Sequence, residues 1–255
     1  MKGLSKKKII VTCGSGGVGK TTMAAAFALQ GALEGKKTIV LTIDPARRLA
    51  TSLGLTTLSD EPTPVPNLPG AGHMDAMMLD TKRTFDRLIE KYAPPSVRDR
   101  IFNNQLYQHM SNMIAGSQEY MAMERLYEIY QSSDYDLMVL DTPPTRHALD
   151  FLEAPKKMMN ITSNSLLKWF LKPGIFAGRV GFGTFKKGTE KILSVLDQLA
   201  GFTFLYELSE MLSLLEDMIR GFHDRAGAVY DLLRQDFVGF VLVTTPQYLA
   251  MQDAL

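Results

Sequence analysis

Short apolar runs alternate with stretches of helical character along the first half of the chain. The runs span residues 8–13, 38–43, 74–79 and 137–140, and a glycine or an aspartate follows each of them. Between the first two lies an alanine-rich stretch, residues 20–33, with Gly35 as a typical helix stop. Four prolines between positions 62 and 69 mark a loop rather than an element. A strand, a helix and a strand in succession form a βαβ unit, so the pattern predicts an α/β fold with a mostly parallel sheet flanked by helices on both faces.

Two longer stretches of helical pattern separate the apolar runs farther along the chain. They cover about residues 81–133 and 155–235, and the apolar run at 237–243 then returns to the sheet. The chain stops on Leu255, inside a predicted helix. We therefore expect a single domain over residues 1–255 with two helical insertions, which form a helical subdomain, and we expect a further strand beyond Leu255.

A glycine-rich loop joins the first apolar run to the first predicted helix. It comprises Gly14, Ser15, Gly16, Gly17, Val18, Gly19, Lys20, Thr21 and Thr22. This order satisfies the P-loop pattern G-x-x-x-x-G-K-[ST], and the strand before it and the helix after it supply the required context. In such a loop the backbone N–H groups surround the β-phosphate, Lys20 reaches the β- and γ-phosphates, and the Thr21 hydroxyl is a ligand of Mg²⁺.

The same glycines also fit a dinucleotide-binding fingerprint. Gly14, Gly16 and Gly19 match G-x-G-x-x-G, and Asp44 ends the second strand where a ribose-binding acid would lie. A dinucleotide site, however, needs neither the lysine nor the hydroxyl that follow the last glycine here. The loop therefore predicts a site for a nucleoside triphosphate and Mg²⁺.

Two aspartates complete the predicted site. Asp141 follows a buried strand, where a Walker-B acid holds Mg²⁺ through water. Asp44 ends the strand next to the P-loop strand, where it can orient or deprotonate the water that attacks the γ-phosphate and can contribute to the metal site. Each has an alternative interpretation, since Asp141 could cap a helix and Asp44 could be a turn residue before Pro45.

Composition narrows the class of protein. A net charge of +1 argues against a general nucleic-acid binder. Cys13 is the only cysteine, so no disulfide framework and no cysteine-based metal cluster can form within one chain. We find no run of 18 or more apolar residues and no secretory leader, and together these features predict a cytoplasmic protein.

Three segments resemble motifs of the ArsA-like family of P-loop ATPases. They are GSGGVGKTT at 14–22, TIDPARRLATSLG at 42–54 and LDTPPTRHALDFL at 140–152. The family includes arsenite-efflux ATPase subunits and the ATPase that delivers tail-anchored membrane proteins, and the chain is most similar to a bacterial subgroup that occurs as paired paralogues. The resemblance implies that ATP closes a dimer and hydrolysis opens it, with residues 44–53 as the first switch and 141–152 as the second.

Two departures from the family pattern matter. The family has a lysine at the second P-loop position, which in relatives crosses the dimer to the partner's phosphates, and this chain has Ser15 there. Arg47, Arg48 or Arg146 could replace that lysine, or a homologous partner could supply it in a heterodimer. The chain also lacks the thiols that arsenite binding would need, and the choice of ATP rests on the resemblance because no guanine motif or base site is visible.

The second helical stretch contains two apolar features. An apolar stripe runs from Leu208 to Ile219 at helical spacing, and an aromatic stretch with several glycines spans residues 169–185. In the tail-anchor ATPase a helical subdomain of this kind holds an apolar client, so the aromatic stretch is a candidate surface for a client or a membrane. Ordinary packing between helices is the favoured interpretation of the stripe.

The sequence thus predicts an enzyme that hydrolyses ATP with Mg²⁺, in a homodimer or in a heterodimer with a paralogue. It would be cytoplasmic, with a peripheral membrane association if the aromatic stretch binds lipid. Two alternatives stay open. One is a catalytically weak subunit that binds ATP and regulates an active paralogue, and the other is a P-loop kinase that phosphorylates a metabolite.

Overall fold

The computed structural model describes residues 4, 6–44, 48–69, 72–104, 107–108, 118–132, 134–143, 153–157, 159–160 and 216–252. The chain divides into two compact units. The first comprises residues 1–84, 117–157 and 226–255, and the second comprises residues 85–116 and 158–225. The first unit contains the sheet and the P-loop.

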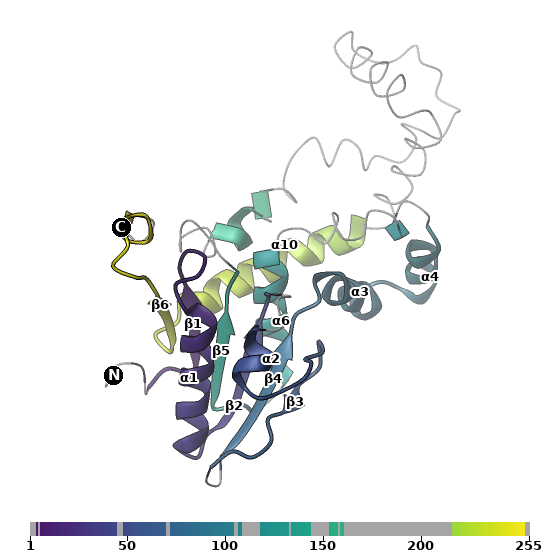
Figure 1. Ribbon diagram of the computed structural model, residues 1–255. Helices are drawn as coiled ribbons and strands as arrows, with labels where there is room; N and C mark the ends of the chain where they lie inside the picture. The colour runs from purple at the N-terminus through teal and green to yellow at the C-terminus, as the bar shows by residue number, and fades with distance from the viewer. Residues whose placement is uncertain are drawn as a thin grey trace, which may run out of the picture. The chain divides into compact units, whose positions relative to one another are not determined.

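The first unit is built on a six-stranded sheet with the order β3-β4-β2-β5-β1-β6 (Figure 1). Its strands are β1 (Ile9–Cys13), β2 (Lys37–Thr42), β3 (Thr63–Pro64), β4 (His73–Met78), β5 (Leu137–Asp141) and β6 (Val238–Leu242). Only β3 runs antiparallel, against β4, and the other strands pair in parallel. The predicted α/β fold with a mostly parallel sheet is confirmed.

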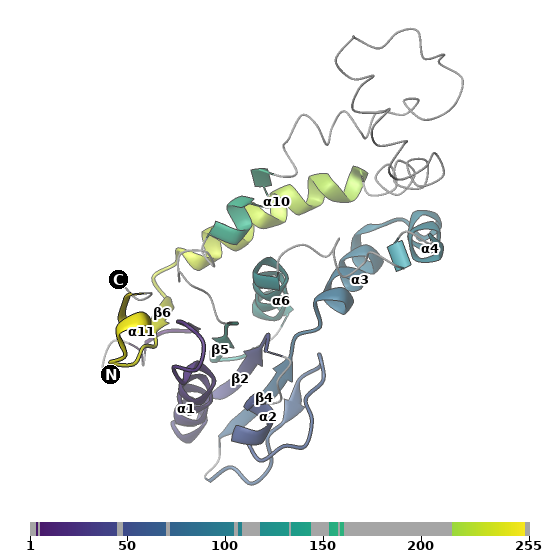
Figure 2. The same ribbon diagram turned by 45° about the horizontal axis from the view of Figure 1, so that its top comes forward.

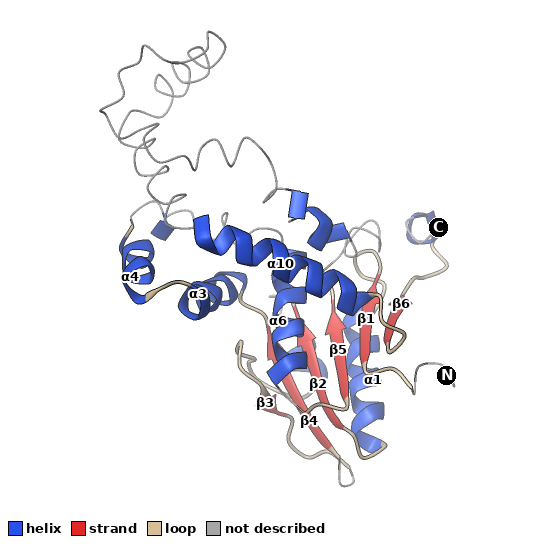
Figure 3. Cartoon of the chain, turned by 180° about the vertical axis from the view of Figure 1, so that it is seen from behind, coloured by secondary structure: helices blue, strands red, loops and turns tan. Residues whose placement is uncertain are grey.

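Helices cover both faces of this sheet (Figures 2 and 3). On one face lie α1 (Lys20–Leu33) and α2 (Arg48–Ser52), which contact each other. On the other lie α6 (Gln118–Ser132) and residues 226–233 of α10 (Glu216–Leu233). The short helix α11 (Tyr248–Gln252) follows β6. The sheet is therefore the middle layer of three, as the sequence predicts.

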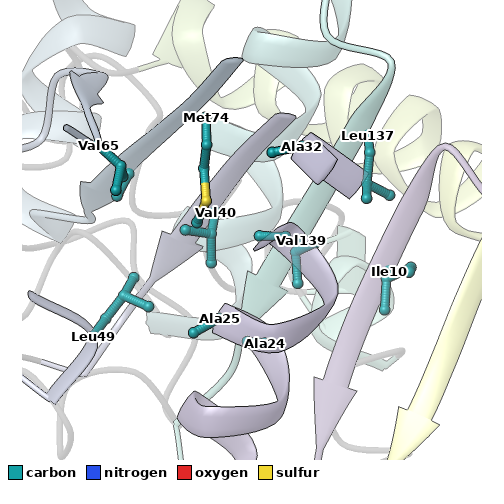
Figure 4. Packing of buried hydrophobic residues seen from close by; sticks show 12 residues of the cluster. Ile10, Ala24, Ala25, Ala32, Val40, Leu49, Val65, Met74, Leu137 and Val139 are labelled. Atoms are coloured by element: carbon teal, nitrogen blue, oxygen red, sulfur yellow. The ribbon is translucent and has the colours of Figure 1, made fainter. Parts of the chain in front are cut away.

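Small side chains let α1 lie close to the sheet. Ala24, Ala25 and Ala32 belong to one buried cluster with Val40 of β2 and Val139 of β5 (Figure 4). A methyl group added at Gly31 of α1 would lie 2.5 Å from the Leu137 side chain, so the bare position leaves room for that side chain between helix and sheet. This packing fixes the amino end of α1 beside the carboxyl ends of β1, β2 and β5, where parallel sheets bind their ligands.

The second unit contains most of α3 (Thr81–Tyr92) and α4 (Pro95–Asn103). Tyr107 packs against Phe85 and Phe102, with ring centroids 6.3 and 5.9 Å away, and its hydroxyl donates a hydrogen bond to Asp86. Pro95 is the first residue of α4, a position where the missing N–H of proline costs nothing. The two prolines at 94 and 95 therefore mark the boundary between α3 and α4.

The two edge strands of the sheet, β3 and β6, differ from the buried central strands. The proline-rich loop contains the two-residue strand β3, which the prolines allow because an edge strand can leave N–H groups unpaired. At the opposite edge, Phe240 and Leu242 of β6 are 37% and 44% exposed.

The further strand expected beyond Leu255 stays a prediction. No helix in the described part of the chain is long and apolar enough to cross a membrane.

Several sequence features lie outside the described residues. These are Arg47, residues 144–152 with Arg146, the aromatic stretch 169–185 and the side chains of the stripe from Leu208 to Ile219. The second switch and the client surface therefore stay predictions.

Candidate active site

The glycine loop turns sharply between β1 and α1. Gly14 has φ +146°, and a methyl group there would lie 2.1 Å from the carbonyl oxygen of Val243. Gly17 and Gly19 also have positive φ values, 78° and 95°, which residues other than glycine rarely adopt. Gly19 is the N-cap of α1 and has no side chain to cap it. The first amides of α1 therefore point into the loop without a side-chain cap, which is the arrangement that binds phosphate.

Lys20 folds back over this loop. Its side chain is buried, with 7% of the residue exposed, and Nζ donates a hydrogen bond to the Ser15 carbonyl oxygen at 2.7 Å. Burial lowers the pKa of Lys20, the carboxylates of Asp141 and Asp44 raise it, and Arg48 lowers it further. The ammonium group thus lies among the charged groups of the site, held by a backbone carbonyl.

Asp141 and Asp44 are joined through Thr42. The Thr42 hydroxyl donates to Asp141 Oδ2 at 2.9 Å and accepts a hydrogen bond from the Asp44 N–H at 3.2 Å. The register explains this contact, because Asp141 pairs with Thr42 on one side and with Thr12 on the other. Asp44 extends away from the sheet and its Oδ2 accepts a hydrogen bond from Arg48 Nη1 at 3.0 Å.

The surroundings of Asp141 fit a divalent cation. Its residue is fully buried, and its Oδ1 has no hydrogen-bond partner among the residues that the structure describes. Burial raises the pKa of Asp141, while the hydroxyls of Thr21 and Thr42 and the charge of Lys20 lower it. A buried carboxylate oxygen beside a threonine hydroxyl is the oxygen donor set that Mg²⁺ prefers, with water and phosphate as further ligands. The described residues contain no cluster of three acidic, histidine or cysteine side chains that would bind a cation without such help.

A cavity of about 510 Å³ opens over these groups. The residues that line it are Gly17, Gly19, Lys20, Thr21, Thr22, Asp44, Arg48, Thr51, Ser52 and Thr142. The volume lies within the range of small-molecule sites. Asp141, the last residue of β5, is not among these lining residues, but its neighbour Thr142 is. The Thr142 hydroxyl donates a hydrogen bond to the Thr12 carbonyl oxygen at 2.7 Å.

The structure therefore brings the predicted residues Lys20, Thr21, Asp44 and Asp141 to one place. Thr51 and Ser52 belong to the predicted first switch and Thr142 to the second, but the sequence predicts no individual role for these residues or for Thr42. For Thr42 a signal existed, because it is the last residue of a buried strand and stands two positions before Asp44. Cys13, the last residue of β1, is buried, and burial raises the pKa of its thiol to about 11.

Comparison with known proteins identifies the relatives of this chain. Residues 7–253 match the model of the family described as anion-transporting ATPase. The chain belongs to the anion-transporting ATPase family. This membership agrees with the resemblance to ArsA-like ATPases and with the P-loop fold, whereas the subgroup of paired bacterial paralogues stays a prediction.

Individual members of the anion-transporting ATPase family are distant from this chain. "ATPase ASNA1 homolog 1" of Paramecium tetraurelia is 31% identical over 151 residues, which cover 59% of this chain and 44% of that protein. "Putative arsenical pump-driving ATPase 1" of Aquifex aeolicus is 28% identical over 173 residues, or 65% of this chain and 40% of that protein. "ATPase GET3A" of Arabidopsis thaliana is 24% identical over 246 residues, which cover 96% of this chain and 60% of that protein. The chain thus spans about half the length of these relatives.

Proposed function

We propose that this protein hydrolyses ATP to ADP and phosphate with Mg²⁺. The observation that carries the proposal is that Lys20, Thr21 and Asp44 line one cavity at the amino end of α1, with Asp141 next to it through its contacts with Thr21 and Thr42. A lysine, a hydroxyl and a Walker-B acid bind the nucleotide and its metal, and the second acid serves the attacking water. The relatives in the same family are named ATPases, which supports hydrolysis over binding alone.

Each group has a defined task in this reaction. The loop amides and Lys20 hold the β- and γ-phosphates, and Thr21 with Asp141 holds the cation. Mg²⁺, when bound, neutralises charge on the phosphate oxygens. Asp44 accepts a hydrogen bond from the water, whose oxygen bonds to the γ-phosphorus while the bond to the β–γ bridging oxygen breaks. The electron pair stays on ADP, and the proton of the water passes to Asp44 and then to solvent.

The resemblance extends the proposal to assembly and location. We infer a cytoplasmic protein in which ATP closes a dimer, either of two identical chains or with a homologous ATPase that carries the P-loop lysine replaced here by Ser15. An apolar client or a membrane surface is the proposed partner of residues 169–185. Light scattering of the chain with a non-hydrolysable ATP analogue would distinguish the two assemblies, because the mass of two chains is expected for the homodimer and the mass of one chain if a homologous ATPase is required.

Phosphate release from Mg-ATP tests the central proposal. The wild-type protein is expected to release phosphate, and Lys20→Ala or excess chelator is expected to abolish the release. ATP binding without turnover would instead support the regulatory-subunit alternative, for which the neutral Ser15 is the specific observation. Consumption of ATP with a phosphorylated acceptor and no free phosphate would indicate a kinase.

Thr42→Val is expected to lower turnover by about tenfold and to raise the Mg²⁺ concentration needed for half-maximal rate. Valine keeps the shape but removes the hydrogen bonds that orient Asp141 and the Asp44 backbone, and loss of such support around a metal ligand costs about 10- to 100-fold. A magnesium titration of phosphate release would measure both changes.

Thr38→Val is the matched control. Thr38 lies on the same strand, is equally buried, and its hydroxyl makes only a 3.4 Å contact to the Lys36 carbonyl oxygen. It should leave the magnesium dependence unchanged, and Thr42→Ser should restore it. An unchanged magnesium requirement in Thr42→Val would contradict the role of Thr42.

A further inference from the structure

Arg48 is a second cation at the phosphate cavity. It is the first residue of α2 and lines the same cavity as Lys20. Its guanidinium Nη1 lies 3.0 Å from Asp44 Oδ2, while 62% of its side chain is exposed. The ion pair is therefore solvent-accessible, and pairs of this kind hold their partners weakly.

Arg48 also lies within electrostatic reach of Lys20. The charge of Arg48 lowers the pKa of the Lys20 ammonium, which means that the two cations repel each other. Such repulsion is relieved when an anion lies between them. Because the cations come from different elements, α1 and α2, and line one cavity, the bound anion that satisfies both is a phosphate chain rather than a single carboxylate.

The charge balance of the cavity favours a second cationic contact to the nucleotide. Among the described lining residues, Lys20 and Arg48 are the cations and Asp44 is the acid. Ser15, in the glycine loop, is neutral. A guanidinium presents a planar fork of donors that matches two oxygens of one phosphate, which an ammonium cannot do.

We propose that Arg48 changes partner when ATP binds, leaving the carboxylate of Asp44 for the terminal phosphate. The proposal rests on the proposed function, since it assigns a contact within the same site. Without ATP the ion pair keeps Asp44 engaged with Arg48. With ATP, Arg48 stabilises charge on the γ-phosphate, and Asp44 accepts its hydrogen bond from water instead. ADP has no γ-phosphate, so the ion pair forms again after hydrolysis.

The exchange predicts a selective loss of affinity in Arg48→Ala. Binding of the ATP analogue with an imido bridge between the β- and γ-phosphates should weaken about tenfold or more, because a charged hydrogen bond is lost. Binding of ADP should change little. Turnover should fall on the order of 10²- to 10³-fold, at or below the low end of the contribution of an arginine finger. Arg48→Lys should lose less, as it keeps the charge without the fork.

Arg83→Ala is the matched control. Arg83 also makes a 3.0 Å ion pair with an aspartate, Asp60, and its side chain is 59% exposed, but it does not line the cavity. This variant should bind both nucleotides like the wild type. Titration calorimetry with the full chain, Mg²⁺ and each nucleotide would measure the affinities. Equal weakening of ADP and analogue in Arg48→Ala, or no change in either, would overturn the proposal.

A double-variant cycle tests the exchange itself. Asp44→Asn removes the ion pair that Arg48 must leave, so it should tighten analogue binding when Arg48 is present and not when Arg48 is alanine. The absence of this coupling would mean that Arg48 does not move between the two partners.

The outcome is distinguishable from failure of the proposed function. If the wild type binds both nucleotides without releasing phosphate, hydrolysis is wrong, while the ratio of analogue to ADP affinity still decides the role of Arg48. If the wild type hydrolyses ATP and Arg48→Ala matches it in binding and rate, only the assignment of Arg48 is wrong. If the wild type binds no nucleotide, both are overturned.

Discussion

Asp44→Asn is expected to slow ATP hydrolysis on the order of 10³-fold without weakening ATP binding. The asparagine is isosteric with the aspartate. Its backbone N–H can still donate a hydrogen bond to the Thr42 hydroxyl, so the backbone of this segment stays in place. What is lost is the charged acceptor that, in the proposed function, orients the attacking water and takes its proton. Single-turnover phosphate release, measured alongside equilibrium binding of the ATP analogue, would separate the chemical step from binding.

The control for Asp44→Asn is the same change at Asp60. Asp60 forms an ion pair with Arg83 at 3.0 Å, as Asp44 does with Arg48. Unlike Asp44, Asp60 is not among the residues that line the cavity. Asp60→Asn should therefore hydrolyse ATP at the wild-type rate. Should Asp44→Asn do the same, another group must position the water, and the assignment of Asp44 is wrong.

The central strands could be predicted closely from the sequence. Residues 38–43 and 74–79 differ by one position from the observed β2 and β4, and the predicted helix 20–33 coincides with α1. Strands that are buried on both faces are apolar throughout, so their ends are marked by the first polar residue or glycine. The P-loop could be predicted because its backbone conformation requires glycine at fixed positions such as Gly14 and Gly19.

Contacts that depend on strand register could not be predicted in this way. Thr42 and Asp141 are 99 positions apart, and only the pairing of β2 with β5 brings their side chains together. The same reason explains β3, whose two residues pair with β4 although their sequence favours a loop. The sequence named Arg48 only as one of three candidate arginines. Its ion pair with Asp44 depends on α2 starting at that residue.

The site has a cost in stability that follows from this register. Asp141 is fully buried at the end of a central strand, with one carboxylate oxygen that no described residue binds. A buried charge without a full set of partners destabilises the folded state. Without Mg²⁺ the carboxylate is thus less favourable than a neutral group of the same shape, and binding of the cation reverses that relation.

Asp141→Asn is therefore expected to stabilise the protein in chelator by on the order of 1 kcal/mol and to abolish magnesium-dependent turnover. The asparagine keeps the hydrogen bond from the Thr42 hydroxyl and removes the buried charge. Burial raises the pKa of Asp141 above its value in the unfolded chain, so its ionisation costs stability at neutral pH, and the cost disappears as the pH falls below the unfolded-state pKa. The advantage of the variant should accordingly be largest at pH 7 and shrink towards acid pH.

Urea unfolding at neutral and at acid pH, in chelator and without nucleotide, would measure this difference. Asp136→Asn is the control, because Asp136 stands next to the start of the same strand, is exposed, and accepts only a backbone hydrogen bond from Lys37 at 2.9 Å. It should leave the free energy of unfolding nearly unchanged. Added Mg-ATP should then stabilise the wild type more than Asp141→Asn, which reverses their order. If Asp141→Asn were less stable than the wild type in chelator at pH 7, the carboxylate would stabilise the strand ends even without a cation, and the prediction would be wrong.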